Sequence, residues 1–322
     1  MSKPKVTFYW CASCGGCEET VVDLAEGVLD VVAAVDIVLW PVALDFKYKD
    51  IEAMADKSIA VSFINGAVRT SEQEHICKLL RQKSQLVVSF GSCAGSGGIP
   101  ALANLTNKQD IFTTVYLDNP SLDNKEKKVP KELSREGKYD LTLPSFYDTV
   151  YKLDDIIEVD YYLPGCPPTP ELIAQAVGAI LKNQLPPKGT ILSPNKALCS
   201  SCKLNDSKPE DIAIKEIKRV IDIKLDPSKC YLAQGVVCMG PATRDGCGVS
   251  CINGNMPCTG CFGPTDSVKD QGAEMISALG GIIDADSSEQ LNKCFARLPD
   301  PAGTFYRYGM SASLLGSKNK KE

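Results

Sequence analysis

Residues 6–19 have the sequence VTFYWCASCGGCEE. The first five of them, Val6–Trp10, form a short apolar run that predicts a buried strand. Three cysteines, Cys11, Cys14 and Cys17, follow this run at intervals of three. Ligands of an open parallel sheet bind beyond the carboxyl ends of its strands. Thiols in this position therefore predict a metal site at the edge of a sheet.

Apolar runs rich in Val and Ile alternate with helical patterns through the first 185 residues. This alternation predicts an α/β fold in which helices cover both faces of a parallel sheet, as in flavodoxin-like proteins. The predicted strands are Val6–Trp10, Val35–Val42, Ile59–Ile64, Leu86–Phe90 and Ile156–Leu163. The predicted helices are Glu18–Gly27, a helix from Thr70 or Ser71 to Lys83, and Pro170–Leu185.

The sequence changes character after Pro186 and Pro187. Residues 188–322 contain nine of the 15 cysteines, and only two helices are predicted there, Pro209–Ile221 and Val268–Leu279. A region with so few apolar runs needs another source of stability, which metal binding provides. We therefore expect a flavodoxin-like domain at residues 1–187 and a loop-rich, C-terminal cluster domain at residues 188–322.

The overall composition limits the classes of function. The chain has 322 residues, of which 44% are hydrophobic and 23% charged, as in ordinary globular proteins. Its net charge of −5 argues against a nucleic-acid partner. No run of 18 apolar residues and no signal peptide are present, so we expect no membrane contact and a cytoplasmic location. In a reducing compartment, 15 cysteines favour metal ligation over disulfides.

One polar stretch interrupts the first half. Residues 118–145 are rich in charged side chains and contain Pro120, Pro130 and Pro144. We expect a surface insertion that behaves as a solvated loop, with contact to a partner as the alternative.

Two more cysteines follow predicted strands. Cys93 lies in FGSCAGSGG, residues 90–98, and Cys166 lies in LPGCPP, residues 163–168. Together with a Cys-x-x-Cys pair at the first strand they would make a site of four thiolates. Glycines beside these cysteines allow the backbone to approach a bulky group. The pattern therefore favours an iron–sulfur cube, with tetrahedral zinc as the alternative because zinc takes the same number of ligands.

The second half supplies eight further thiols that divide, by order, into two sets of four, although an interleaved grouping is also open. Structural zinc is an alternative for this half. The eight are Cys199, Cys202, Cys230, Cys238, Cys247, Cys251, Cys258 and Cys261.

Five segments in this order together resemble the small subunit of nickel–iron hydrogenases over nearly the whole chain. They are CGGCEE at 14–19, GSC at 91–93, PGCPP at 164–168, CMGPAT at 238–243 and PCTGC at 257–261. The resemblance implies three 4Fe-4S clusters. It implies that Cys14, Cys17, Cys93 and Cys166 hold the proximal cluster. The distal cluster would use Cys199, Cys202, Cys230 and Cys238, and the medial one Cys247, Cys251, Cys258 and Cys261.

The chain departs from many members of that family at two positions. Cys199 stands where many members have a histidine ligand of the outer cluster. Many members also have a proline near the position of Cys251 and a three-iron middle cluster, whereas a thiolate at this position implies a four-iron one. Both departures resemble cytoplasmic members, especially the methyl-viologen-reducing hydrogenases that serve heterodisulfide reductase. No ferredoxin motif is appended, which argues against the deazaflavin-reducing class.

The resemblance implies a role in electron transfer without hydrogen activation. In the family, paired Cys-x-x-Cys motifs of the large subunit hold nickel and iron, and the Asp-Pro-Cys-x-x-Cys form is absent from this sequence. We expect no catalytic residue in this chain. The implied partners are a hydrogenase large subunit and an iron–sulfur acceptor subunit, such as one of a heterodisulfide reductase complex.

Several residues near the clusters have open roles. The ligating pair at the N-terminus is either Cys11 with Cys14 or Cys14 with Cys17, because both pairs have the same spacing. In the family segment a glutamate follows the second cysteine by two positions, as Glu19 follows Cys17, so we choose Cys14 and Cys17. Cys11 is then a neighbouring buried thiol, or one that tunes the cluster or replaces a ligand on oxidation. Glu18 and Glu19 either orient a cluster loop or join a proton route, or are simply acids at a helix N-terminus.

The remaining Cys and His residues have ordinary interpretations. Cys77 and Cys294 are expected in the core. His75 is expected on the surface of its helix.

Three other classes of protein compete with this interpretation. The related cluster subunit of complex I-like quinone reductases shares the first domain but lacks the second. A flavodoxin-like FMN protein with a zinc-bound tail would need a hydroxyl-rich phosphate loop after the first strand. A non-catalytic zinc scaffold would contain zinc in place of iron and sulfide.

Overall fold

The structure, a computed structural model, describes residues 3–182, 184–298 and 300–316. Its centre is a five-stranded sheet with the strand order β2-β1-β3-β5-β9, in which every neighbouring pair is parallel. This is the doubly wound order of flavodoxin-like proteins, and it confirms the predicted fold class. The strands are β1 (Lys5–Trp10), β2 (Asp36–Leu39), β3 (Ile59–Asn65), β5 (Ser84–Phe90) and β9 (Tyr161–Leu163).

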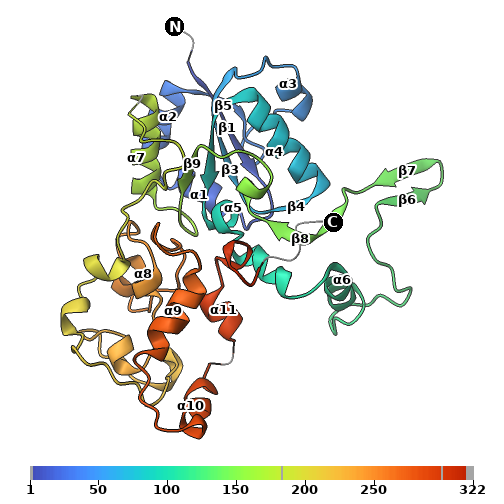
Figure 1. The fold of residues 1–322 in the computed structure, drawn as a ribbon. Helices are drawn as coiled ribbons and strands as arrows, with labels where there is room; N and C mark the ends of the chain where they lie inside the picture. The colour runs from blue at the N-terminus through green and yellow to red at the C-terminus, as the bar shows by residue number, and fades with distance from the viewer. Residues whose placement is uncertain (1–2, 183, 299, 317–322) are drawn as a thin grey trace.

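Helices cover both faces of this sheet (Figure 1). On one face, Val21, Leu172 and Ile173 pack against strand residues such as Phe8. On the other face, Ile76 and Leu80 pack against Ile64 and Val87. The first face carries α1 (Gly16–Val22), α2 (Gly27–Ala34) and α7 (Pro170–Leu181), and the second carries α3 (Tyr48–Glu52) and α4 (Ser71–Lys83).

The prediction of α4 is confirmed at both ends. Thr70 caps the helix, because its Oγ1 accepts a hydrogen bond from the amide of Gln73 at 3.3 Å. Cys77, in this helix, is completely buried, as expected for a core residue.

The predicted helix Glu18–Gly27 was wrong in extent. The segment forms the end of α1 and the start of α2, separated by a turn in which Ala25 has a φ of 52°. The predicted strand Ile156–Leu163 was too long, because residues 156–160 form turns and irregular backbone and only Tyr161–Leu163 joins the sheet.

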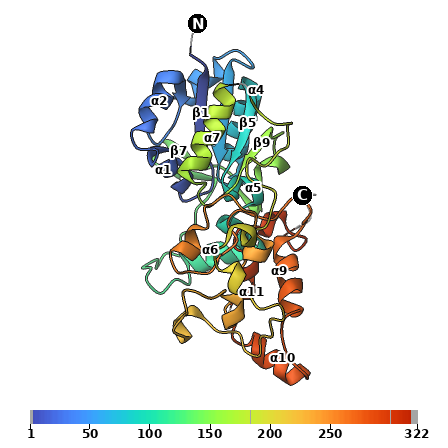
Figure 2. The ribbon, with the colours of Figure 1, turned by 90° about the vertical axis from the view of Figure 1, so that its left-hand side faces the viewer.

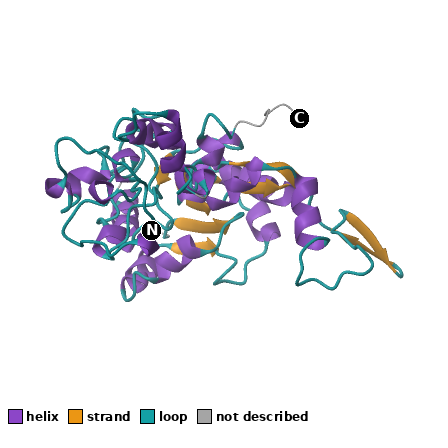
Figure 3. Ribbon diagram, turned by 90° about the horizontal axis from the view of Figure 1, so that it is seen from below, coloured by secondary structure: helices purple, strands orange, loops and turns teal. Residues whose placement is uncertain are grey.

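Residues 118–145 lie on the surface, as expected, but contain an unpredicted hairpin, β6 (Leu133–Glu136) with β7 (Tyr139–Thr142). The segment leaves the body after α6 (Lys108–Tyr116) and returns in β8 (Phe146–Tyr151), which pairs with β4 (Val68–Thr70). Seen from below, the hairpin extends far from the rest of the molecule (Figure 3).

The second half is built mainly from turns and loops around a core that includes Leu198, Ile217 and Met275. This core also takes in Ala67, Ala101 and Val150 of the first half. The α-helices of the second half are α8 (Ser250–Asn253), α9 (Gln271–Gly280), α10 (Ser288–Phe295) and α11 (Pro301–Phe305). Its 3-10 turns are Leu198–Ser201, Asn205–Ser207, Val220–Asp222, Leu232–Gln234, Gly240–Ala242 and Met310–Ala312. Cys294 is buried in α10, as expected.

The predicted helix Pro209–Ile221 was wrong, whereas the prediction over Val268–Leu279 is confirmed as α9. Ile214 and Lys218 form bridges to Ile283 and Val236, so this segment pairs with distant chain and is not helical. Tertiary pairing overrides the helical propensity of the segment.

The last described residues return to the first half. Ser311 Oγ donates to the carbonyl of Val150 at 2.6 Å, and Ser96 Oγ donates to the carbonyl of Tyr308 at 2.6 Å. Within residues 3–182, 184–298 and 300–316, no helix is both long and apolar enough to cross a bilayer.

Candidate metal centres

Four thiols from three loops meet at the carboxyl edge of the sheet. Cys14 follows β1, Cys17 lies in α1, Cys93 lies in α5 (Ser92–Ser96) directly after β5, and Cys166 follows β9. These loops are neighbours because β1 and β5 flank β3, and β9 lies beside β5. Cys17 and Cys93 are buried, whereas Cys14 is exposed. We call these four the inner set.

The thiols of the inner set lie close enough to raise one another's pKa. Burial raises the pKa of Cys93 to about 12, and charges on Cys166 and Cys14 add to the effect. Burial also raises the pKa of Cys17, with further contributions from Cys93, Cys166 and Cys14. A bound cationic group would remove this penalty, because its charge stabilises the deprotonated thiols. The inner set therefore suits a metal-containing group.

Two glycines keep space open beside these sulfur atoms. A Cβ atom on Gly91 would lie 2.4 Å from Cys17 Sγ, and one on Gly98 would lie 2.4 Å from Cys93 Sγ. Both residues also have positive φ angles, 83° and 58°, which L side chains rarely adopt. The backbone therefore approaches the thiols more closely than any other residue type would allow.

Asn65, at the end of β3, ties the inner-set loop to the sheet. Its Nδ2 donates to the carbonyl of Tyr9 and to Glu18 Oε1, both at 3.2 Å, and its Oδ1 accepts from Ser13 Oγ at 2.9 Å. Burial raises the pKa of Glu18, and the hydrogen bond from Asn65 opposes that rise. Sequence reasoning assigned Asn65 no role, and its only signal was a polar side chain at the end of a buried strand.

The two glutamates after Cys17 differ in environment. Glu18 is only 2% exposed, whereas Glu19 is exposed in the first turn of α1. The position of Glu19 fits an acid stabilised by the helix N-terminus.

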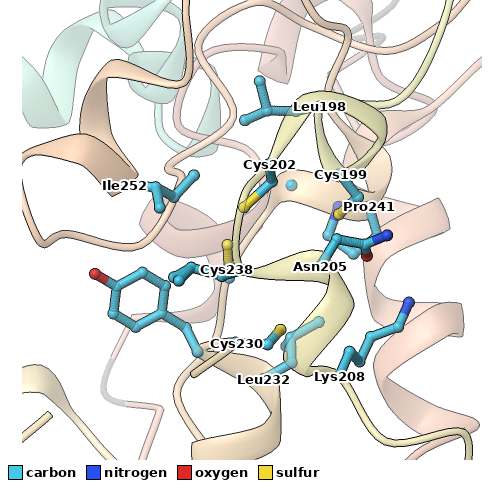
Figure 4. A pocket seen from close by; sticks show the side chains of 13 residues that line it. Leu198, Cys199, Cys202, Asn205, Lys208, Cys230, Leu232, Cys238, Pro241 and Ile252 are labelled. Carbon is cyan, nitrogen blue, oxygen red and sulfur yellow. The ribbon is translucent and has the colours of Figure 1, made fainter. Parts of the chain in front are cut away.

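A second group of four thiols lines a single pocket in the C-terminal half. Figure 4 shows Cys199, Cys202, Cys230 and Cys238 around the same space, with Leu198 and Ile252 among the apolar residues at its walls. Lys208 also lines the pocket, and its charge lowers the pKa of Cys199, although burial and the other thiols raise that pKa to about 12 overall. We call these four the outer set.

The third group, Cys247, Cys251, Cys258 and Cys261, we call the middle set. Burial raises the pKa of Cys261 to about 12, and charges on Cys247, Cys251 and Cys166 contribute to the rise. Burial raises the pKa of Cys258 too, with contributions from Cys238 and Cys261. Cys261 is thus near the other middle-set thiols and near the inner set.

Direct contacts join the middle set to both of the others. Cys261 lies near Cys166, whose backbone acts to lower the pKa of the Cys261 thiol, and Ser92 Oγ donates to the carbonyl of Cys261. On the other side, the amide of Cys258 donates to Cys238 Sγ at 3.3 Å. The middle set therefore lies between the inner and outer sets.

Two further observations concern metal-binding residue types. Within the described ranges, no three Cys, His, Asp or Glu side chains form a group that could hold a single metal ion. His75 lies on the surface of α4, as expected, with its side chain 65% exposed and its Nε2 4.0 Å from Glu52 Oε1.

Comparison with known proteins identifies the family. The chain is 40% identical to the iron–sulfur subunit of the F420-non-reducing hydrogenase of Archaeoglobus profundus, over 98% of each chain. It is 35% identical to a subunit of the F420-non-reducing hydrogenase of Methanothermobacter marburgensis, over 99% of this chain and 98% of that one. The chain belongs to the family of F420-non-reducing hydrogenase iron–sulfur subunits. It is accordingly part of an oxidoreductase complex, and the resemblance stated from its motifs is confirmed.

Two other comparisons place this hydrogenase subunit in a wider group. The family model described as NADH ubiquinone oxidoreductase, 20 Kd subunit, matches residues 14–180. This match ends before Cys199, so the outer and middle sets lie outside the part shared with quinone reductases. The recombinant [NiFeSe] hydrogenase from Desulfovibrio vulgaris Hildenborough has a similar fold, with a TM-score of 0.52, 19% identity, and coverage of 82% of this chain and 94% of that one.

Proposed function

We propose that this chain is the iron–sulfur electron-transfer subunit of a nickel–iron hydrogenase. It would carry electrons from hydrogen oxidation in a large subunit to an acceptor subunit, such as one that feeds heterodisulfide reductase. The observation that carries the proposal is the row of three four-thiol sets, in which Cys261 lies against Cys166 and Cys258 lies against Cys238. A row of this kind has no role in a flavin protein.

Each set would hold one 4Fe-4S cluster. The proximal ligands are Cys14, Cys17, Cys93 and Cys166, the medial ligands Cys247, Cys251, Cys258 and Cys261, and the distal ligands Cys199, Cys202, Cys230 and Cys238. We also propose that residues 1–187 form the domain of the proximal cluster and residues 188–322 the domain of the other two. A cytoplasmic location fits the 15 cysteines, all of which are free.

When bound, the clusters would supply one-electron chemistry at three points along the chain. The residues of this chain would control the access of water to the clusters and the reduction potentials of the clusters. Buried apolar side chains such as Phe262 and Met239 exclude water from the middle set. Amide donors to sulfur, such as Cys258 to Cys238 and Gly16 to Cys14 at 3.5 Å, raise the potential of the group that the sulfur holds.

The two ends of the row differ in what they offer a partner. Cys14 is the exposed thiol of the inner set, so this end suits a hydrogenase large subunit that carries the nickel–iron site. The outer-set pocket has the exposed Lys208 among its lining residues, so this end suits an acceptor.

The test is anaerobic purification of the complex with assay of iron, sulfide and zinc. We expect about twelve irons and twelve sulfides per chain, no stoichiometric zinc, and paramagnetic signals after reduction. A hydrogenase large subunit should co-purify. Stoichiometric zinc without sulfide would instead support the zinc scaffold and end this proposal.

A substitution links the inner set to turnover. We expect Cys166→Ala to abolish hydrogen-dependent reduction of a dye, and Cys294→Ala, a buried thiol outside the three sets, to leave the rate near that of the wild type. Near-normal rates in Cys166→Ala would contradict the assignment of the inner set.

A further inference from the structure

Residues 118–145, which we call the arm, expose apolar side chains. In Figure 1 its hairpin stands away from the body, and every residue of β6 and β7 is exposed. Leu133, Tyr139, Leu141 and Leu143 are between 54% and 63% exposed. A solvated loop gains nothing from such residues, so the arm differs from the polar loop that its charges predict.

Three of these side chains share one face of the hairpin. Tyr139 and Leu141 alternate along β7 and point to the same side. Leu143, directly after the strand, continues this alternation, and its amide donates to the carbonyl of Glu132 at 3.0 Å. The residues opposite Tyr139 and Leu141 on this face are Glu136 and Ser134. The other face carries Arg135 and Asp140, which form an ion pair at 3.4 Å, together with Leu133 and Thr142. The three apolar side chains therefore form one row on this face, beside Glu136 and Ser134, whereas Leu133 is the apolar residue of the reverse side.

An isolated two-stranded hairpin is at best marginally stable in water, because it buries too little apolar surface. The base of the arm, in contrast, is firmly held. Ser71 and Ser145 exchange two hydrogen bonds of 3.0 Å, and the Arg69 guanidinium stacks on the Phe146 ring at 4.3 Å from its centroid. The protein thus fixes the direction of the arm but leaves its apolar face uncovered.

The base of the arm is joined to the inner-set loop. Thr70 pairs with Phe146 at the base of the arm, and in the same segment Ala67 forms a bridge with Ala12, two residues before Cys14. Two hydrogen bonds of 2.9 Å make this bridge. Trp10, beside the same loop, is 39% exposed. In Figure 2, α1, α2 and the loop that follows α6 all reach out on the same side of the molecule.

We propose that the arm is a docking element for the hydrogenase large subunit, which its apolar face, Tyr139, Leu141 and Leu143, contacts. This inference rests on the proposed function, because that function places the large subunit at the exposed Cys14. A partner seated on the inner-set loop is close to the base of the arm, since residues 67–70 pair with Ala12 at one end and with Phe146 of β8 at the other. The large subunit then covers the apolar face and stabilises the hairpin.

The experiment compares two triple variants of the hairpin in the complete chain, each co-produced anaerobically with a tagged large subunit. One variant, Tyr139→Ser with Leu141→Ser and Leu143→Ser, removes the apolar face. The control, Arg135→Ser with Asp140→Ser and Thr142→Ser, alters the opposite face. We expect the first variant to reduce the affinity for the large subunit at least about tenfold, and the control to change it less than about twofold. Iron content and the spectra of the clusters should match the wild type in both.

The outcomes separate the two proposals. If the wild-type chain captures the large subunit and the apolar-face variant captures it equally well, the arm inference is wrong and the proposed function stands. If the wild-type chain captures no large subunit, the proposed function itself fails. If the wild-type chain alone forms a dimer that the apolar-face variant loses, while capture of the large subunit is unchanged, the arm binds a second copy and the inference is overturned.

Discussion

The sulfur of Cys11 lies 3.5 Å from the sulfur of Cys77, in the core between β1 and α4. Cys11 continues the alternation of β1, so it faces the same side of the sheet as Tyr9. Burial raises the pKa of the Cys11 thiol well above its ordinary value, and the Cys77 thiol adds to this rise. Cys11 therefore packs with Cys77, and the choice of Cys14 and Cys17 as the ligating pair gains support.

The first prediction separates these two possible pairs. Cys17→Ala should lower the iron content by about four atoms per chain, because it removes a proposed ligand of the proximal cluster. Cys11→Ala should leave the iron content at the wild-type value. Iron analysis of anaerobically purified variants checks both, and an iron deficit in Cys11→Ala would show that Cys11 is a ligand.

The second prediction concerns Gly91. Its replacement by Ala places a Cβ atom 2.4 Å from Cys17 Sγ at a φ of 83°, so the thiol must move. We expect Gly91→Ala to lose the proximal cluster while the other two remain, measured by iron content and paramagnetic resonance. Gly95→Ala, in the same α5 loop, is the control, because the nearest contact of its Cβ would be an ordinary 3.6 Å. Equal cluster content in both variants would count against a steric role for Gly91.

The third prediction concerns Asp160, which directly precedes β9 and whose side chain is completely buried. Its Oδ2 accepts from Arg81 Nη1 at 2.6 Å and from the Val87 amide at 2.8 Å, and Lys188 Nζ lies 2.5 Å from its Oδ1. Burial acts to raise the pKa of Asp160, but the hydrogen bonds from Lys188, Arg81 and Val87 outweigh it, so the pKa is lowered. We expect Asp160→Ala to reduce the free energy of unfolding by about 3 kcal/mol at pH 7, measured by chemical denaturation.

The pH dependence of that effect follows from the sign of the shift. A carboxyl with a lowered pKa in the folded state stabilises the protein above its unfolded pKa of about 3.9, and the stabilisation is lost as the pH falls through the folded pKa. The gap between wild type and Asp160→Ala should therefore be full at neutral pH and narrow below about pH 4. Asp45→Ala is the matched control, because Asp45 pairs with Lys47 on the open surface and should contribute little.

The fourth prediction concerns removal of the metal. The second half contains mostly turns and short helices, so we expect it to depend on its clusters for stability. After anaerobic chelation of iron, amide hydrogen exchange should increase strongly over residues 199–261. Exchange in β3 and β5 should change little, because those strands are held by the apolar core of the sheet. Equal loss of protection in both halves would contradict this division.

Several elements that depend on local interactions were predicted correctly from the sequence, whereas an element that depends on contacts distant in sequence was not. The apolar runs at Ile59–Ile64 and Leu86–Phe90 and the helix capped by Thr70 were predicted because local pattern and burial agree at those positions. The segment Pro209–Ile221 was not, because its structure depends on bridges to Ile283 and Val236, far away in sequence. The hairpin in residues 118–145 was missed because charged and proline residues concealed its alternating Tyr139, Leu141 and Leu143.

The sequence by itself determined the fold class, the family and the set of available thiols, since these depend on residue types and spacing. Only the tertiary structure decided which distant thiols are neighbours. The order of the cysteines along the chain does not show which of them are close together. The fold brings Cys261 near Cys166 and Cys258 near Cys238, although each pair is far apart or belongs to different sets in the sequence. The physical reason is that loops from separate strands and turns meet in space through packing of the core, which no local pattern specifies.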